Sequence, residues 1–125
     1  MTIYIGHRTS KGEVYFCKRV HHGTFEQVVP ELEERDPLVE LKANLFGLVI
    51  AFLADVDSKG IDEVVTSSQR TINCVEDGTL YGDTHVACMR MILREVAIKR
   101  KKRTKFIYTP KPNNPIYNRK LWRTE

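Results

Sequence analysis

Long apolar runs, cysteine, and acidic residues in the first and last parts of the chain are all scarce in this 125-residue sequence. No apolar run approaches the roughly 20 residues that cross a bilayer, and the N-terminus lacks the apolar segment of a signal peptide. We therefore expect a cytoplasmic protein with no membrane contact. Cys17, Cys74 and Cys88 are too few and too widely spaced for a disulfide framework or a zinc site. We expect all three to be reduced and mostly buried.

Other signatures of chemistry are also missing. No glycine-rich loop has the spacing that cradles phosphates, which argues against a nucleotide hydrolase. His21 and His22 lie in a predicted turn, whereas His7 and His85 are isolated, so no histidine spacing matches a metal site. No base can be assigned to activate a cysteine as a nucleophile. The sequence therefore predicts neither a catalytic residue nor a metal ligand nor a cofactor.

Charge is distributed very unevenly along the chain. Residues 1–83 carry 8 Lys/Arg against 14 Asp/Glu, a net charge of −6, whereas residues 84–125 carry 12 against 2, a net charge of +10. A basic C-terminal third of this kind favours a polyanionic partner, whether nucleic acid, a nucleotide or an acidic protein surface. A solvated helix face is the alternative explanation.

The order of predicted elements indicates a single α/β domain spanning residues 1–125, a length that can bury one core. Glycine-containing loops join the first three β-rich runs into an antiparallel meander. An apolar helix begins at Asp36–Pro37, where an N-cap acceptor precedes proline, and a later strand should lie parallel to the meander. The predicted strands are 2–8, 13–20, 24–29, 63–67 and 104–109, and the predicted helices are about 36–55, a short one after Ser68, and 83–102. We expect residues 110–115, PKPNNP, to form a rigid extended connector.

Two stretches of this sequence resemble the ribonuclease H-like fold. VELKANLFGLVIAFL (39–53) resembles the family's first long helix, with Glu40 at the place of its glutamate, and VVTSSQRTINCV (64–75) resembles the end of its fourth strand and the helix that follows. The resemblance implies a mixed five-stranded sheet, a three-strand antiparallel meander followed by parallel strands, with helices packed on it. In the family, carboxylates from strand one, the first helix, strand four and the C-terminal helix hold two divalent metals.

Most of those carboxylates have no counterpart here. Ser67 stands where the family has an aspartate, Asn118 is the nearest match to the last one, and the first acidic residue, Glu13, comes after the first strand. Hard cations need oxygen ligands that are preferably charged, so the resemblance implies a vestigial active site at Glu40, Ser67 and Asn118. A carboxylate near a helix N-terminus is also favoured by the helix dipole, which is the structural alternative for Glu40.

The strongest remaining signal is the basic run KRKKRTK, residues 99–105, in which six of seven residues are Lys or Arg. Trp122 offers a stacking surface for bases or, alternatively, a cover for the edge of the core. The predicted nucleic-acid-binding residues are Lys99, Arg100, Lys101, Lys102, Arg103, Lys105, Arg119, Lys120 and Trp122.

Three functional hypotheses remain open. The first is a non-catalytic ribonuclease H-like module, a pseudoenzyme, that binds nucleic acid or a nucleotide through this basic surface. The second is a small phage or mobile-element protein that sequesters a host protein or a signalling nucleotide. The third is a divergent metal-dependent nuclease that recruits carboxylates from Asp62, Glu63, Asp77 or Asp83. A homo-oligomer is compatible with each.

Overall fold

The structure is a computed structural model that describes residues 1–20, 23–54, 60–99 and 103–121. Its centre is a mixed five-stranded sheet with the strand order β3-β2-β1-β4-β5. β1 pairs antiparallel with β2, which pairs antiparallel with β3, whereas β4 lies parallel to both β1 and β5. The predicted mixed sheet is confirmed. The strands are β1 (Thr2–Ser10), β2 (Glu13–Val20), β3 (Gly23–Val28), β4 (Glu63–Thr66) and β5 (Lys105–Tyr108).

The β1–β2 hairpin closes through Lys11 and Gly12, which both have positive φ, 53° and 79°. Two successive residues of this kind form the tight turns whose twist matches that of antiparallel strands. β4 then follows a helical crossover, and such a crossover returns the chain parallel to its starting strand. The tight turn thus accounts for the antiparallel half of the sheet, and the helical crossover accounts for the parallel half.

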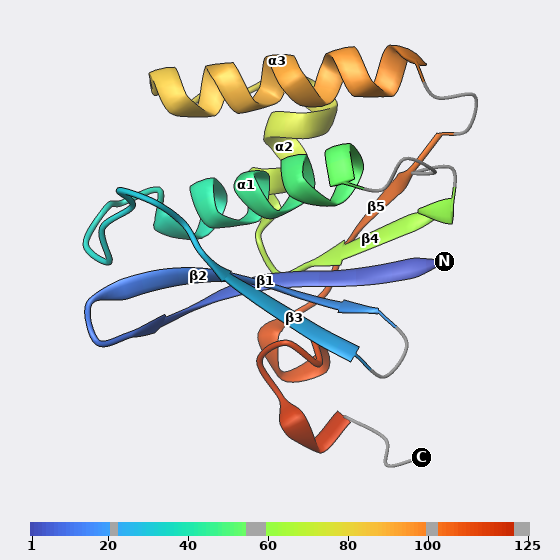
Figure 1. The fold of residues 1–125 in the computed structure, drawn as a ribbon. Helices are drawn as coiled ribbons and strands as arrows, with labels where there is room; N and C mark the ends of the chain where they lie inside the picture. The colour runs from blue at the N-terminus through green and yellow to red at the C-terminus, as the bar shows by residue number, and fades with distance from the viewer. Residues whose placement is uncertain (21–22, 55–59, 100–102, 122–125) are drawn as a thin grey trace.

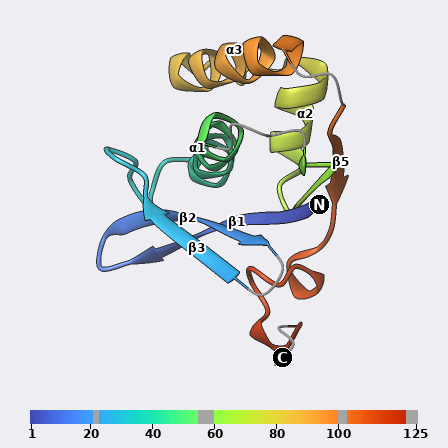
Figure 2. The same ribbon diagram turned by 45° about the vertical axis from the view of Figure 1, so that its right-hand side comes forward.

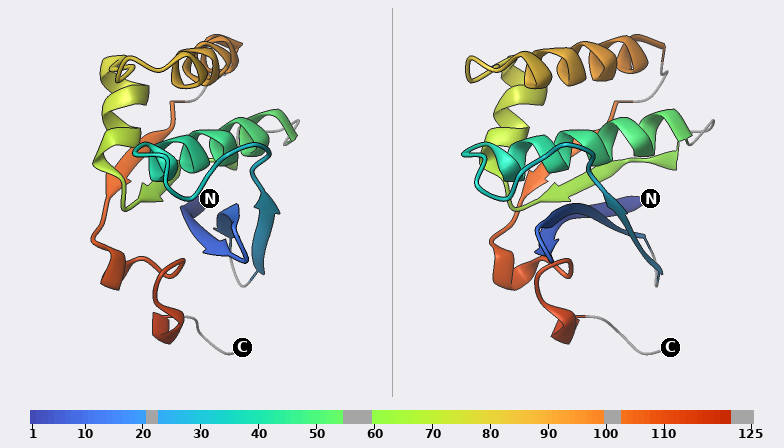
Figure 3. Two further views of the ribbon diagram at one scale, coloured as in Figure 1. Left: turned by 90° about the vertical axis from the view of Figure 1, so that its left-hand side faces the viewer. Right: turned by 60° about the vertical axis from the view of Figure 1, so that its left-hand side comes forward.

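Three helices cover one face of the sheet: α1 (Val39–Ala54), α2 (Gln69–Asp77) and α3 (Thr84–Lys99). α1 lies directly on the sheet and α3 packs on α1 from outside, while α2 lies beside β5 (Figures 1 and 2). The chain after β5 passes to the opposite side of the sheet (Figure 3). No helix within the described parts of the chain is both long enough and apolar enough to cross a membrane.

The core lies between the sheet and α1. Ile3 and Ile5 of β1 meet Leu45 and Leu48 of α1, and all four are essentially inaccessible to solvent. Gly47 allows α1 to approach β2 closely, because a Cβ at this position would lie 2.7 Å from Cδ2 of Phe16. The apolar helix predicted from the sequence therefore packs on the sheet, whereas Leu53 near its C-terminal end is 56% exposed.

Two sequence predictions are wrong in detail. Cys17 and Cys74 are buried as expected, and burial raises the pKa of the Cys17 thiol to about 12, but Cys88 is exposed. Cys88 lies on the side of α3 opposite the buried Val86 and Leu93, where small apolar residues are tolerated at the surface.

The predicted extended connector is the second error. Residues Lys111–Asn113 form a 3₁₀ turn, because the Asn113 N–H donates to the Pro110 carbonyl (2.9 Å) and the Asn114 N–H donates to the Lys111 carbonyl (3.0 Å). Proline is compatible with the start of such a turn, where its missing N–H leaves no bond unmade. A second 3₁₀ turn spans Arg119–Leu121.

A charged cluster joins the starts of α1 and α3. The Lys42 ammonium lies 2.6 Å from Oδ2 of Asp36 and 2.8 Å from Oδ2 of Asp83. Asp36 also accepts a hydrogen bond from the Leu38 N–H, and Asp83 accepts one from the Val86 N–H, so each carboxylate also caps a helix start. Hydrogen bonding to Lys42 is the main reason why the pKa values of both aspartates are lowered.

Replacing Lys42 with methionine should therefore reduce stability in a pH-dependent way. At pH 7 we expect Lys42→Met to lower the free energy of unfolding by about 1–3 kcal/mol, because two facing carboxylates lose their shared cation. Lowered folded-state pKa values stabilise above the unfolded value of about 3.9 and lose that effect as pH falls below it. The difference from wild type should thus shrink below about pH 4 in urea titrations. Lys120→Met, at an exposed position, is the control and should change little.

Candidate functional site

Polar residues converge where β1 and β4 part. β4 ends at Thr66, whereas its parallel neighbour β1 continues to Ser10. The register pairs Ile3 with Val64 and Tyr4 with Val65, so its continuation brings Gly6 beside Ser67. The end of a parallel strand at such a junction is a common location for binding and catalytic groups in α/β sheets.

Neutral hydroxyl groups fix the junction between β4 and α2. Ser68 caps α2, since its Oγ accepts a hydrogen bond from the Thr71 N–H (3.2 Å), and the Ser68 N–H donates to Oγ1 of Thr66 (3.0 Å). Asn44 of α1 donates its amide to Oγ1 of both Thr66 and Thr71, each at 3.3 Å. All four side chains are buried, so the junction is tied to α1 by a network without a formal charge.

Residues 110–121, here called the C-terminal strap, cover this junction from the other side of the sheet (Figure 3). Asn114 is completely buried and donates its amide to the Ile5 carbonyl (3.2 Å) and to Oγ of Ser67 (3.1 Å). Its own Oδ1 accepts a hydrogen bond from the Ile116 N–H (3.0 Å). One side chain therefore links the strap to both β1 and the end of β4.

The strap also lies directly against the backbone of Gly6. A Cβ at this position would lie 2.6 Å from Cγ2 of Ile116 and 2.9 Å from Cε2 of Tyr117. Real Cβ atoms essentially never approach other heavy atoms so closely. Any side chain at position 6, a carboxylate included, would thus require the side chains of Ile116 and Tyr117 to shift.

Tyr117 joins the strap to His7. The Tyr117 hydroxyl accepts a hydrogen bond from the His7 N–H (3.1 Å) and lies 3.0 Å from Nδ1 of the same histidine. Burial lowers the pKa of His7, although Glu40 opposes this effect, and burial raises the pKa of Tyr117. A neutral His7 that accepts the tyrosine proton at Nδ1 and carries its own proton on Nε2 satisfies both groups.

Glu40, the one acidic residue at a predicted vestigial position, has a cation beside it. The Lys111 ammonium of the strap lies 3.4 Å from Oε2 of Glu40 and 5.1 Å from the centroid of the Tyr117 ring. The carboxylate thus has a cationic partner within the same chain. Among the described residues, no group of three or more His, Cys, Asp or Glu side chains is placed to hold a metal ion.

The predicted site residues divide into three groups. Glu40 and Ser67 lie at the strap junction, whereas the amide of Asn118 donates to the Pro112 carbonyl and accepts from the Lys120 N–H within the strap. Sequence reasoning missed Asn114, since nothing in the pattern NNP marks which asparagine is buried. Arg103, Lys105, Arg119 and Lys120 are exposed and Lys99 ends α3, while Arg100, Lys101, Lys102 and Trp122 lie outside the described residues.

The close contact at Gly6 predicts a coupling that a double-mutant cycle can measure. We expect Gly6→Ala to lower the free energy of unfolding by about 1–3 kcal/mol, because the added methyl group overlaps Ile116. In an Ile116→Ala background the same change should cost less, giving a coupling of at least about 0.5 kcal/mol. Gly23→Ala is the control, since its Cβ would meet only the Val20 carbonyl oxygen at 3.7 Å. Strictly additive costs at Gly6 and Ile116 would contradict the packing described above.

Comparisons with known proteins agree with this architecture. No family model matches the chain, and no curated protein matches its sequence. Among solved structures, the chain is similar to RNase H1 from the halophilic archaeon Halobacterium salinarum NRC-1, with a TM-score of 0.61 and 15% sequence identity. The match covers 87% of this chain and 84% of that one. Together with the strand order, this similarity establishes that the protein has a ribonuclease H-like fold.

Proposed function

We propose that the protein is a non-catalytic ribonuclease H-like module that binds nucleic acid or a nucleotide through its basic C-terminal third. The proposed loss of catalysis rests on the contact of Ile116 with the Gly6 backbone. A Cβ at position 6 would lie 2.6 Å from Cγ2 of Ile116, which leaves no room for a carboxylate side chain there. This position is the one that strand one offers beside Ser67.

Cleavage by two divalent metals requires several carboxylates that hold the ions about 4 Å apart. Gly6 and Ser67 contribute no charge, and Asn114 is a neutral amide that already bonds Ser67. Glu40 remains, but the Lys111 ammonium lies 3.4 Å from it. Gly6, Ser67, Asn114 and Glu40 together favour the loss of a two-metal site over its relocation to other carboxylates.

Two considerations favour a nucleic-acid ligand. The similar solved structure is an RNase H1, and the C-terminal third of this chain is rich in cations. Among the described residues of the basic third, Arg103, Lys105, Lys111, Arg119 and Lys120 are exposed. Cations that contact phosphates release condensed counterions, which supplies most of the affinity in sequence-independent binding.

The first test is a cleavage assay with an RNA·DNA hybrid in Mg²⁺ or Mn²⁺, in which we expect no product. An active RNase H1 run in parallel verifies the substrate, and Glu40→Gln removes the one acidic residue at a predicted vestigial position while keeping its shape. Metal-dependent cleavage that disappears in Glu40→Gln would establish the divergent nuclease instead.

The second test measures binding of labelled DNA and RNA as salt is raised. We expect Lys101→Gln/Lys102→Gln to weaken binding to many sequences alike and to reduce the slope of log K against log salt by about 1.4–1.8. Lys11→Gln/Arg35→Gln removes the same charge from the acidic part of the chain and should leave the slope unchanged. Equal affinities for wild type and the Lys101/Lys102 variant would favour a protein partner instead.

A further inference from the structure

The two edges of the sheet differ in how well they are protected. β5 has only four residues, begins with the exposed Lys105, and lies against α2. β3 has six residues, GTFEQV, of which the first four are exposed, and it contains neither lysine nor proline. Natural proteins commonly guard exposed edges with lysine, proline, short strands or a covering helix. β5 shows these devices and β3 does not.

The single charge on β3 is already compensated within the chain. Oε2 of Glu26 lies 2.6 Å from the Arg8 guanidinium of β1, and Cys17 of β2 contacts the other carboxylate oxygen at 3.6 Å. On the helix-bearing face, the Lys18 ammonium of β2 lies 5.7 Å from the centroid of the Phe25 ring. An arriving strand would therefore meet a carboxylate that is already paired and a cation that lies over an aromatic ring. Because the edge carries charges of both signs, it suits antiparallel pairing with an identical strand.

The hydrogen-bonding groups of β3 alternate between inward and outward directions. The Val29 N–H donates to the Val14 carbonyl at 2.8 Å, and antiparallel pairs alternate between bonded and non-bonded positions. Gly23, Phe25 and Gln27 consequently bond to β2, whereas Thr24, Glu26 and Val28 direct their N–H and C=O groups away from the sheet. An added antiparallel strand would pair with these three residues.

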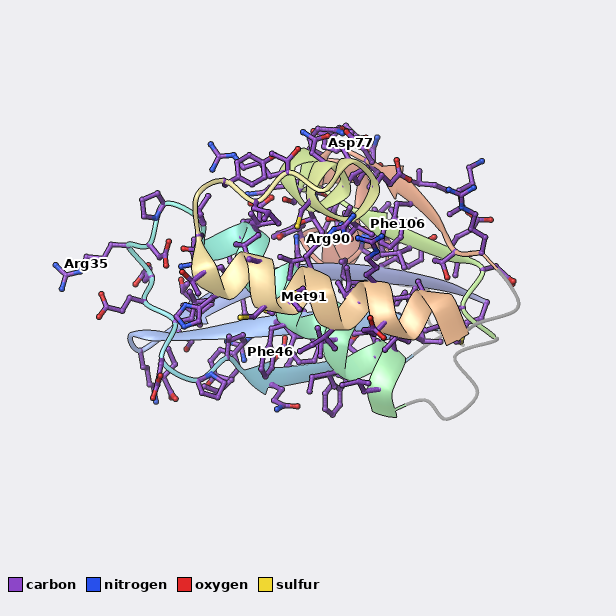
Figure 4. The ribbon with its side chains drawn as sticks, turned by 90° about the horizontal axis from the view of Figure 1, so that it is seen from above. Arg35, Phe46, Asp77, Arg90, Met91 and Phe106 are labelled. Atoms are coloured by element: carbon purple, nitrogen blue, oxygen red, sulfur yellow. The ribbon has the colours of Figure 1, made fainter. Side chains whose placement is uncertain are left out.

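Apolar side chains flank the same edge. Phe25 is 48% exposed, and its ring centroid lies 5.9 Å from that of Phe16. Phe46 of α1 also packs on Phe16, with ring centroids 5.8 Å apart, and both Phe46 and Ile50 are only partly buried in this part of the core. Figure 4 shows Phe46 and the α2 residue Asp77 on opposite sides of α3, so Phe46 lies on the side of α3 away from Asp77. An incomplete apolar surface thus continues from the β3 edge onto α1.

We propose that β3 is a dimerisation edge, at which two copies of the chain pair their β3 strands antiparallel about a two-fold axis at Phe25. A two-fold interface places identical surfaces against each other, which an edge with charges of both signs allows. An axis at Glu26 would set two carboxylates opposite one another. An axis at Phe25 instead pairs Thr24 with Glu26 of the second copy and brings the two phenylalanine rings together on the helix-bearing face. This inference goes beyond the proposed function and does not depend on it.

Sedimentation equilibrium over a concentration series tests the dimer. We expect a mass approaching twice the 14.5 kDa of the chain, and Phe25→Lys should weaken the dimer by at least about tenfold. Met91→Lys is the matched control, because Met91 is 66% exposed but lies on the outer side of α3 (Figure 4). Thr24→Pro is a second variant that removes an outward N–H without touching the Phe16 contact, and it should also weaken the dimer. A wild-type monomer at several hundred micromolar would overturn the proposal, as would dissociation by Met91→Lys alone.

Disulfide trapping tests the register. In a Cys88→Ser background, which removes the exposed native thiol, oxidised Phe25→Cys should form a disulfide-linked dimer. Directly opposed non-bonded residues lie about 4.5 Å apart at Cα, within the range that disulfides bridge. Gln27→Cys should cross-link far less, because it would lie opposite Gly23 of the second copy. Efficient linkage at Gln27 with none at Phe25 would overturn the proposed axis.

Discussion

The contact between the C-terminal strap and the Gly6 backbone is the constraint on which the candidate site depends. Because residue 6 has no side chain, Ile116 and Tyr117 reach the strand itself. That approach places Asn114 within hydrogen-bonding distance of the Ile5 carbonyl and Ser67, and Tyr117 within reach of His7. It also places Lys111 beside Glu40. The absence of a side chain at residue 6 therefore allows all of these contacts to form.

The first half of α1 organises the rest of the molecule. Three of its polar residues contact three different parts of the chain: Glu40 contacts the strap, Lys42 the start of α3, and Asn44 the junction between β4 and α2. The apolar residues between them bind the helix to the sheet without directional preference. The polar contacts fix the orientation of the helix, because each one has a narrow range of acceptable distances and angles.

The sequence predicted the sheet well because its signals are local. Short glycine-containing loops specify hairpins, and an apolar helix between two strands specifies a parallel crossover. Glu40 and Ser67 were singled out because both lie in stretches with a recognisable pattern, and both contact the strap. Asn114 could not, since its burial depends on contacts with Ile5 and Ser67, which are more than forty residues away. Cys88 was misjudged because the number of apolar residues on α3 exceeds what one face can bury.

The pairing of Lys111 with Glu40 has a consequence for how such a site could change over generations. A lysine ammonium is tethered to the chain, so it stays near its carboxylate whatever the concentration of divalent cations around the protein. An acidic residue introduced at position 6 would first have to displace Ile116, and it would share the junction with the Lys111 ammonium. Such a substitution would therefore cost stability before the new carboxylate could bind a cation. Packing at position 6 thus opposes the gain of an acidic side chain there, whatever the function of the protein.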